Sequence, residues 1–303
     1  MSTSSVMLTR SSSKGASAPL KERMAAGPGT GVHGKAEVVF AVKSGGTRLS
    51  HLYQHEPLRV LFPSSPKEDV LGAVVVNTSG GLVGGDSLDL SVALGPGAQA
   101  LVTTQAAEKL YRSIGADCLV TAVIEVGENA WLEWLPQETI IFDGARLRRR
   151  TTLTVSPGAR LLAGEVLVFG RIARGEALSH GLIHDEWRLC MGGRLLWADS
   201  LHLAGDLAAK LAAPAGFRGS KAMATFVYAA QDAPRWLEAA RELIDPSLSG
   251  EGWAGVTCIR SLLLIRWLST DAAVVRRSYG VFWKRFRSMV GNLPPRLPTI
   301  WNI

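Results

Sequence analysis

Two segments of this chain concentrate residue types that bind ions or activate small molecules. The first spans residues 77–86 and contains the glycines Gly80, Gly81, Gly84 and Gly85 followed by Asp86. Glycines allow positive φ angles and close backbone approach, which suits either an anion-binding loop or a tight turn between strands. The segment contains neither the G-x-G-x-x-G order of a dinucleotide-binding turn nor the Gly-Lys-Ser/Thr of a P-loop.

The second segment, residues 131–144, carries the carboxylates Glu133, Glu138 and Asp143. Carboxylates in this number could ligate a metal or act as general acids and bases. Glu133 and Glu138 lie on either side of Pro136, so the sequence leaves open whether they face the same way. The alternative is a strand, a proline bend and a second strand, with the carboxylates at the edges.

A hydrolase is a further possibility, because two short strings match the signature of GDSL-type esterases. Gly85-Asp86-Ser87-Leu88 would provide Ser87 as nucleophile, with His202 as its base and Asp199 as the orienting acid. Against this assignment, Ser87 leads into an alternating strand pattern, whereas the esterase nucleophile opens a helix. Both strings are short enough to occur by chance.

The histidines and cysteines give little support for a tight metal site. His51/His55 and His180/His184 have i, i+4 spacing, which brings two imidazoles onto one metal only in a helix, and their surroundings are typical of strands or loops. Cys118, Cys190 and Cys258 are far apart without a C-x-x-C pair, which fits a reducing compartment such as the cytoplasm. We therefore expect neither a tightly bound metal nor another tightly bound cofactor.

The net charge of +7 over 303 residues first suggests a nucleic-acid or membrane partner, but its distribution argues against both. Residues 1–33 carry +3, residues 34–271 carry −2, and residues 272–303 carry +6. A near-neutral body does not provide a phosphate-tracking groove. No apolar run reaches the length of a membrane span. Arg146 to Arg150 alternate as in a strand, so these arginines do not share one face.

The fold expected from the patterning is mainly β, a layered multi-stranded scaffold with a few α-helices in the C-terminal third. Turn signals such as Gly95-Pro96-Gly97 separate short apolar or alternating runs, without helices between them. The expected strands are 73–76, 88–94, 100–104, 119–126, 130–135, 139–142, 147–155 and 160–169. Residues 1–34 are Ser/Gly/Pro/Ala-rich and predicted to be a disordered arm before a single domain, 35–303, which is β-rich over 35–204 and helix-containing over 205–303. No internal repeat is predicted.

Two helices are expected in the C-terminal part. Asp232 can cap the first, which Pro234 begins and Asp245-Pro246 ends. The second runs from Asp271 to about Val290, where Gly291 ends it, and its basic residues are predicted to form a solvated face. Residues 255–268 could form either a strand or a short helix.

Taken together, several motifs resemble those of the urease accessory protein D (UreD/UreH) family in order and spacing. They are GGLVGGDSL (80–88), GPGA (95–98), TTQAAEKLYRS (103–113), LEWLPQETIIFDGA (132–145), PGARLL (157–162), RGE (174–176) with HG (180–181), and PPRLPTIW (294–301). The resemblance covers residues 34–303. One departure is that Asn77-Thr78-Ser79 stands where many members have His-Pro-Pro, so a nickel role for that histidine does not transfer to this chain.

The resemblance implies a non-enzymatic chaperone that helps to insert nickel into urease. It implies as partners the urease structural subunits, an F-type accessory protein and, through the latter, a nickel-carrying GTPase, with no nucleic acid and no membrane. Ni²⁺ would be held transiently, because a closed histidine or cysteine cage would trap it. We expect Asp86, Glu108, Glu138 and Asp143 to line a nickel passage. The expected partner-binding residues are Arg276, Arg277, Phe282, Trp283 and Phe286.

Overall fold

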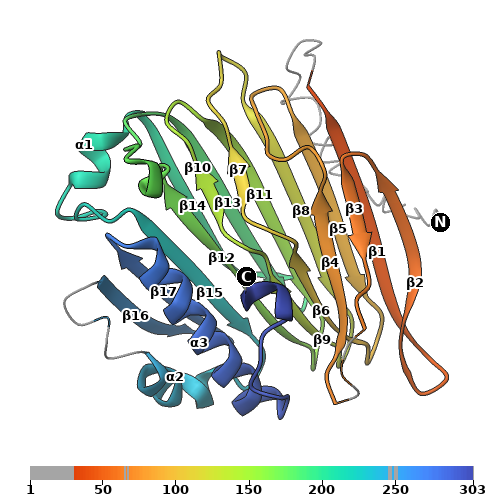
Figure 1. The fold of residues 1–303 in the computed structure, drawn as a ribbon. Helices are drawn as coiled ribbons and strands as arrows, with labels where there is room; N and C mark the ends of the chain where they lie inside the picture. The colour runs from red at the N-terminus through yellow and green to blue at the C-terminus, as the bar shows by residue number, and fades with distance from the viewer. Residues whose placement is uncertain (1–30, 65, 67, 245–247, 249–251, 303) are drawn as a thin grey trace, which may run out of the picture.

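The chain passes back and forth between two β-sheets that lie face to face, with helices on the outside of one sheet (Figure 1). The computed structural model describes residues 31–64, 66, 68–244, 248 and 252–302. This architecture confirms the predicted mainly β, layered scaffold with few helices. The predicted arm, residues 1–34, lies outside the described residues except at its end, where the first strand begins at His33.

One sheet has seven strands in the order β14-β13-β11-β8-β5-β1-β2. Their bounds are β1 His33–Lys43, β2 Gly46–His55, β5 Ser87–Leu94, β8 Cys118–Val126, β11 Arg146–Val155, β13 His180–Met191 and β14 Arg194–Asp206. The five central strands run parallel, and the hairpin strands β2 and β14 close the two ends antiparallel.

The other sheet has ten strands, eight of them in the order β16-β17-β15-β12-β9-β6-β4-β3. Their bounds are β3 Leu58–Leu61, β4 Leu71–Asn77, β6 Gln99–Thr104, β9 Trp131–Leu135, β12 Arg160–Phe169, β15 Ala222–Ala229, β16 Gly252–Ile259 and β17 Leu262–Ser269. The other two strands are β10 Thr139–Ile141, which pairs with β12, and β7 Glu108–Leu110, which pairs with β10. Residues 255–268, which the sequence left open, form the β16–β17 hairpin.

A stack of three similar turns connects the two sheets, and this repetition is the point that the sequence analysis missed. The turns are Gly95–Ala98, Gly127–Ala130 and Ser156–Ala159. In each, the third residue (Gly97, Asn129, Gly158) has positive φ, and the alanine amide donates to the first residue's carbonyl. The three alanines are buried in the core between the sheets. The turns therefore form a short structural repeat of about 30 residues.

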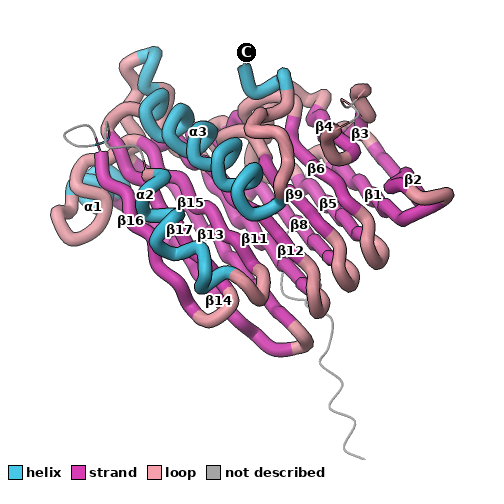
Figure 2. Tube along the Cα trace, turned by 90° about the horizontal axis from the view of Figure 1, so that it is seen from below, coloured by secondary structure: helices cyan, strands magenta, loops and turns pink. Residues whose placement is uncertain are grey.

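Hydrophobic packing occurs on both faces of the ten-stranded sheet. One core fills the space between the sheets, and a second lies between the ten-stranded sheet and α3 (Ala272–Gly291), which crosses its outer face (Figure 2). Short helical segments complete the C-terminal part. They are α1 Leu207–Ala212, α2 Leu237–Leu243, η3 Ala233–Trp236 and η5 Thr299–Asn302, with η2 Ile172–Arg174 between β12 and β13.

The two predicted helices form, with differences at their ends. Asp271 caps α3 by accepting a hydrogen bond from the amide of Ala273 at 2.8 Å, as expected. The helix ends at Gly291 as predicted, and the left-handed residue that caps it is Asn292. Asp232 does not cap the first helix, because its carboxylate accepts a hydrogen bond from the hydroxyl of Tyr228 at 2.7 Å instead. No helix within the described ranges combines the length and apolarity needed to cross a membrane.

Candidate functional site

The glycine-rich segment folds as a packed turn held by its own carboxylate. Asp86 is 5% exposed, and its two oxygens accept the amides of Val83 and Val32, each at 2.9 Å. A Cβ atom at Gly81 would lie 2.4 Å from the ring of Tyr111, so glycine allows the turn to pack against the next motif. The structure therefore favours a tight turn, and the Asp86 carboxylate is occupied in holding it.

Most of the motif turns gather at one end of the sandwich, the upper edge in Figure 1, which we call the rim. The rim comprises residues 78–86, 109–117, 142–145 and 170–180. Asp143 joins two of these loops, because Oδ1 accepts from the amide and hydroxyl of Ser179 at 2.7 and 2.8 Å, while Oδ2 accepts from Arg112 at 3.2 Å. Burial opposes its ionisation, but the hydrogen bonds from Ser179 and from the amide of His180 lower the pKa of Asp143.

A cavity of about 220 Å³ lies between the two sheets, directly below the rim. Its walls are mostly apolar, and the polar side chains among its lining residues include Asn77, Glu108, Gln137, Thr139, Arg149 and Glu165. Gly80, Gln105 and Lys109 also line it and are exposed, so the cavity reaches the surface at the rim. A mostly apolar cavity with a few polar side chains and an opening has the usual character of a small-molecule pocket.

Glu108 lies at the rim end of this cavity. Its carboxylate accepts two hydrogen bonds from the side-chain amide of Asn77, at 3.0 and 3.1 Å. Burial raises the pKa of Glu108, although the Asn77 hydrogen bonds act in the opposite direction. Asn77 thus orients this carboxylate.

A buried charge cluster forms one wall of the cavity. Arg149 donates to Asp185 from Nε at 3.0 Å, and its Nη2 also pairs closely with both Asp185 and Glu165. Trp187 donates to the other oxygen of Glu165 at 3.0 Å. Burial and the neighbouring Asp185 carboxylate raise the pKa of Glu165 to about 8. One guanidinium therefore serves two buried carboxylates, and the cluster favours an additional proton or cation.

This cluster was not predicted from the sequence, although a signal was present. Glu165 is the only charged residue between Leu161 and Phe169, an otherwise apolar strand. A lone carboxylate in such a strand must be paired within the fold, because burying an unpaired charge is too costly. The arginines of residues 146–150 do not share one face, as predicted. Arg149 points inward, whereas Arg148 and Arg150 lie on the outer face and pair with Asp117 and Glu186.

The four predicted passage carboxylates do not converge on one site. Only Glu108 lines the cavity, whereas Asp86 holds the glycine turn and Asp143 joins the rim loops. Glu138 accepts a hydrogen bond from Arg276 Nε at 3.1 Å on the other side of the ten-stranded sheet. Glu133, also considered as a ligand, is fully buried beneath α3 and pairs with Arg287.

The predicted partner-binding surface on α3 requires correction. Phe282, Trp283 and Phe286 are at most 1% exposed and belong to the core between α3 and the sheet, so they are not available to a partner. Arg276 is half-buried, with its guanidinium 4.9 Å above the ring of Trp301. Arg277 alone of the five predicted residues is exposed. The apolar stripe is the helix's own packing face.

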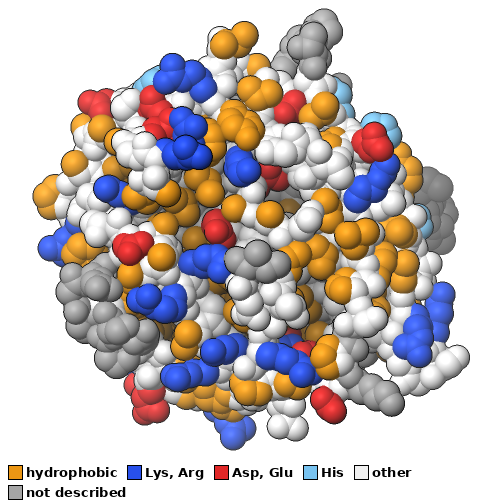
Figure 3. All heavy atoms as spheres, in the orientation of Figure 1, with side chains coloured by type: hydrophobic (Ala, Val, Ile, Leu, Met, Phe, Trp, Pro, Cys, Tyr) orange, Lys and Arg blue, Asp and Glu red, His pale blue; other side chains and the backbone are white. Residues whose placement is uncertain are grey.

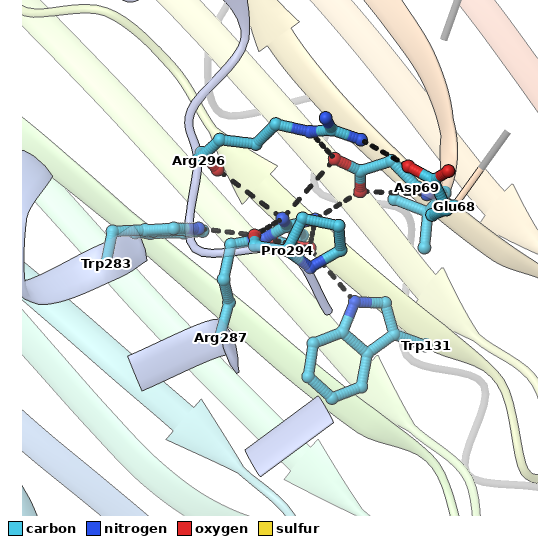
Figure 4. Close-up of polar contacts among 9 residues, drawn as sticks. Glu68, Asp69, Trp131, Trp283, Arg287, Pro294 and Arg296 are labelled. Carbon is cyan, nitrogen blue, oxygen red and sulfur yellow. Dashed lines mark hydrogen bonds and ion pairs between the residues drawn. The ribbon is translucent and has the colours of Figure 1, made fainter. Parts of the chain in front are cut away.

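Arg287 also differs from its predicted place on a solvated face. Its guanidinium is fully buried and pairs with Glu133 and Asp69 at 2.8 and 2.6 Å. Figure 4 shows how Arg296 and the carbonyl of Pro294 complete this network, which joins α3, the sheet and the C-terminal segment. Hydrogen bonds from Arg287 and Arg296 overcome the opposing effect of burial and lower the pKa of Asp69.

The histidine pairs lie along strands, as expected. His51 and His55 are both in β2 and four residues apart, a separation of roughly 13 Å in an extended chain. His180 and His184 are both in β13. Among the described residues, no group of three or more His, Cys, Asp or Glu side chains could hold a metal ion.

The geometry contradicts the esterase alternative. Ser87 is in β5 and His202 in β14, with three strands between them in the sheet. Asp199 pairs with Arg266 of the other sheet, so it does not orient His202, which contacts the ring of His184. The histidine nearest to Ser87 is His33, whose Nδ1 lies 2.7 Å from the hydroxyl. Ser87, Asp199 and His202 therefore do not form a triad.

The fold and the site define a β-scaffold protein with a cavity between its two sheets and a cluster of loops at one end of them. Comparison with known proteins gives the family: a family model described as "UreD urease accessory protein" matches residues 32–302. The chain belongs to the UreD urease accessory protein family. This confirms the resemblance, and because the family is one of accessory proteins, the chain is not an enzyme.

Individual relatives agree along nearly the whole chain. The chain is 45% identical over 280 residues to the urease accessory protein UreD of Magnetococcus marinus, covering 91% of this chain and 96% of the relative. It is 43% identical over 270 residues to that of Xanthobacter autotrophicus, covering 88% and 89%. It is 38% identical over 293 residues to that of Rhodopseudomonas palustris, covering 96% and 99%. The family places the chain in urease maturation.

Proposed function

We propose that this chain acts in urease maturation as a nickel-insertion chaperone in the cytoplasm, binding apo-urease and giving Ni²⁺ a route to the buried active site. The observation that carries the proposal is the cavity between the sheets, which opens at the rim and has Glu108 and Glu165 among its lining residues. Ni²⁺ accepts carboxylate and water ligands, and separated carboxylates bind it weakly enough to release it.

The buried cluster supports transit of a cation in preference to an anion. Glu165 and Asp185 share the single guanidinium of Arg149, so a cation entering the cavity replaces the proton that Glu165 otherwise holds. The hydrogen bonds from Asn77 meanwhile hold the Glu108 carboxylate at the rim end of the cavity. Nickel would then be bound only transiently, consistent with the scattered placement of the carboxylates.

The accessory partners are part of the same proposal. An F-type accessory protein docks on the C-terminal region, and a nickel-carrying GTPase binds through it and supplies GTP hydrolysis. Since the aromatic residues of α3 are buried, its exposed basic residues Arg277 and Arg285 are the ones that face such a partner. Arg277→Glu with Arg285→Glu should weaken binding to the F-type protein, and unchanged binding would count against this surface.

The central experiment is co-expression of urease and its accessory proteins with and without this chain, followed by measurement of nickel per purified urease. Nickel content should fall severalfold when the chain is omitted. Unchanged loading in its absence would refute the proposed function.

The cavity route is tested by two isosteric variants in the same assay. Glu108→Gln and Glu165→Gln should each reduce nickel per urease, while co-purification with urease stays unchanged. Glu125→Gln, an exposed position on the outer face of β8, is the matched control and should load normally. Normal loading in both cavity variants would exclude this route and leave the maturation role standing.

A further inference from the structure

The rim carries an exposed apolar patch that does not pack into the interior of the protein. Ile114 at the tip of the 111–117 loop is 106% exposed relative to a reference isoleucine, and Val83 and Tyr111 are 42% and 39% exposed. Soluble proteins rarely place such side chains together in water unless they meet a partner. The patch therefore calls for a specific occupant.

The loops that carry this patch are held in place by contacts within the rim. Gly81 packs against the Tyr111 ring, and that ring meets Phe142 edge to face with centroids 4.9 Å apart. Behind Val83, the Ser113 hydroxyl donates to the carbonyl of Ala116 at 2.5 Å. The patch is thus pre-formed, which lowers the ordering entropy lost on binding.

Positive charge surrounds the patch. Lys109, Arg112, Arg171 and Arg174 belong to the rim loops and are exposed, whereas the four rim carboxylates, Asp86, Asp117, Asp143 and Glu176, are buried or half-buried. All four carboxylates already have partners: Asp86 accepts two backbone amides, Asp117 pairs with Arg146, Asp143 with Arg112 and Glu176 with Arg171. In Figure 3, which has the orientation of Figure 1, blue and orange side chains lie next to one another along this upper edge. Lys109 and Arg174 remain available to a partner's acids.

We infer that the rim, centred on Ile114, Val83 and Tyr111, is a docking surface for a folded protein that presents a small apolar socket bordered by carboxylates. An apolar centre with a charged border is the usual anatomy of a specific protein interface. The identity of this partner rests on the proposed function, which makes it apo-urease. The cavity opens among the same loops, so the docked partner would cover its mouth and make the two interiors continuous.

The test is binding of the full-length chain to purified, metal-free urease from the same source, measured by biolayer interferometry. Ile114→Asp and Val83→Asp should each weaken binding at least tenfold, and Lys109→Glu with Arg174→Glu should weaken it and reduce its salt dependence. Leu195→Asp is the matched control, because Leu195 is 48% exposed but lies at the end of β14 that is away from the rim. Urea unfolding midpoints of all variants should equal that of the original chain.

Hydrogen exchange supplies a second readout that needs no variant. Amides of residues 111–116 should become protected when apo-urease binds, whereas those around Leu195 should not. Binding by Ile114→Asp and Val83→Asp that equals the original chain, or the absence of protection at 111–116, would overturn the inference while the maturation role stands. Failure of the original chain to bind apo-urease would instead overturn both. Loss of binding to phosphatidylserine vesicles in Ile114→Asp, with urease binding intact, would reassign the patch to membranes.

Discussion

Arg287 and Glu133 form an ion pair at 2.8 Å in which neither side chain is exposed to solvent. They are 154 residues apart in sequence, and the pair links α3 to the centre of the ten-stranded sheet. Trp283 and Trp131 donate to the same carboxylate at 2.7 and 3.1 Å, so its oxygens are fully used. This arrangement fixes how the helix sits on the sheet and is the basis of the first prediction.

Arg287→Met should lower the free energy of unfolding by about 3–5 kcal/mol, because it leaves Glu133 buried without a counter-charge. Chemical denaturation in urea, followed by tryptophan fluorescence, measures the change. Arg285→Met on the same helix is the control, since Arg285 is exposed, and should change stability by less than about 0.5 kcal/mol. Equal effects of the two substitutions would show that the buried pair has no special role.

Tyr279 and Tyr228 offer a matched pair of buried hydroxyls. No described atom is within hydrogen-bond distance of the Tyr279 hydroxyl, whereas the Tyr228 hydroxyl donates to Asp232 at 2.7 Å. Tyr279→Phe should be neutral or slightly stabilising, and Tyr228→Phe should cost about 1.5–3 kcal/mol because its acceptor is charged. Thermal unfolding of the two variants measures both effects. A larger loss of stability in Tyr279→Phe than in Tyr228→Phe would contradict the prediction.

The cluster at the cavity wall predicts a pH-dependent stability. The pKa of Glu165 is raised in the folded chain to about 8, so the folded state holds a proton that the unfolded state has already released above about pH 4.3. The stability contributed by this proton on Glu165 is fully present below the pKa that Glu165 has in the unfolded chain, and it is lost as pH rises to about 8. Glu165→Gln should therefore gain stability relative to the original chain between pH 5 and pH 8.

Urea unfolding at pH 5, 6.5 and 8 measures that difference. Glutamine retains an oxygen that accepts the Trp187 hydrogen bond, and Arg149 keeps Asp185 as its partner. Glu125→Gln, exposed on β8, should show a constant difference from the original chain over the same range. A constant difference for Glu165→Gln as well would show that Glu165 is already ionised at pH 5.

Asp86 is predicted to matter for folding because of the two backbone amides that it accepts. Asp86→Ala should lower the free energy of unfolding by about 1–3 kcal/mol, at about 0.5–1.5 kcal/mol for each of the two part-buried hydrogen bonds lost. Asp89→Ala, three residues further along the chain in β5 and exposed, should be nearly neutral. Equal stability of the two variants would contradict a structural role and return Asp86 to the candidates for ion binding.

Much of the scaffold could be predicted locally. All eight expected strands form, with ends shifted by one or two residues, because alternation and turn residues act over a few neighbouring positions. The α3 boundaries follow from Asp271 and the helical spacing of the aromatic residues. The stacked turns were also visible in principle, since Gly95-Pro-Gly-Ala, Gly127-Glu-Asn-Ala and Ser156-Pro-Gly-Ala have one pattern.

The placement of charged side chains was not predictable in this way. Sequence periodicity put Arg287 on a solvated face and left the facing of Glu133 open, whereas packing places both in the core. The reason is that a buried charge is stable only with its partner, and the partners here are 154 residues apart. Glu165 and Asp185 likewise meet at Arg149 only after the two sheets have stacked.

The sequence by itself determined the family, the layered β fold and the assignment of the protein as a non-enzyme. It could do so because motif order, strand periodicity and turn residues are local properties of the chain. The tertiary structure alone decided which carboxylates face the cavity, and it separated Glu108 from Asp86, Glu138 and Asp143. It also moved the aromatic residues of α3 into the core and left Ile114 in solvent. Burial and charge pairing depend on distant segments meeting, and no local pattern records which segments meet.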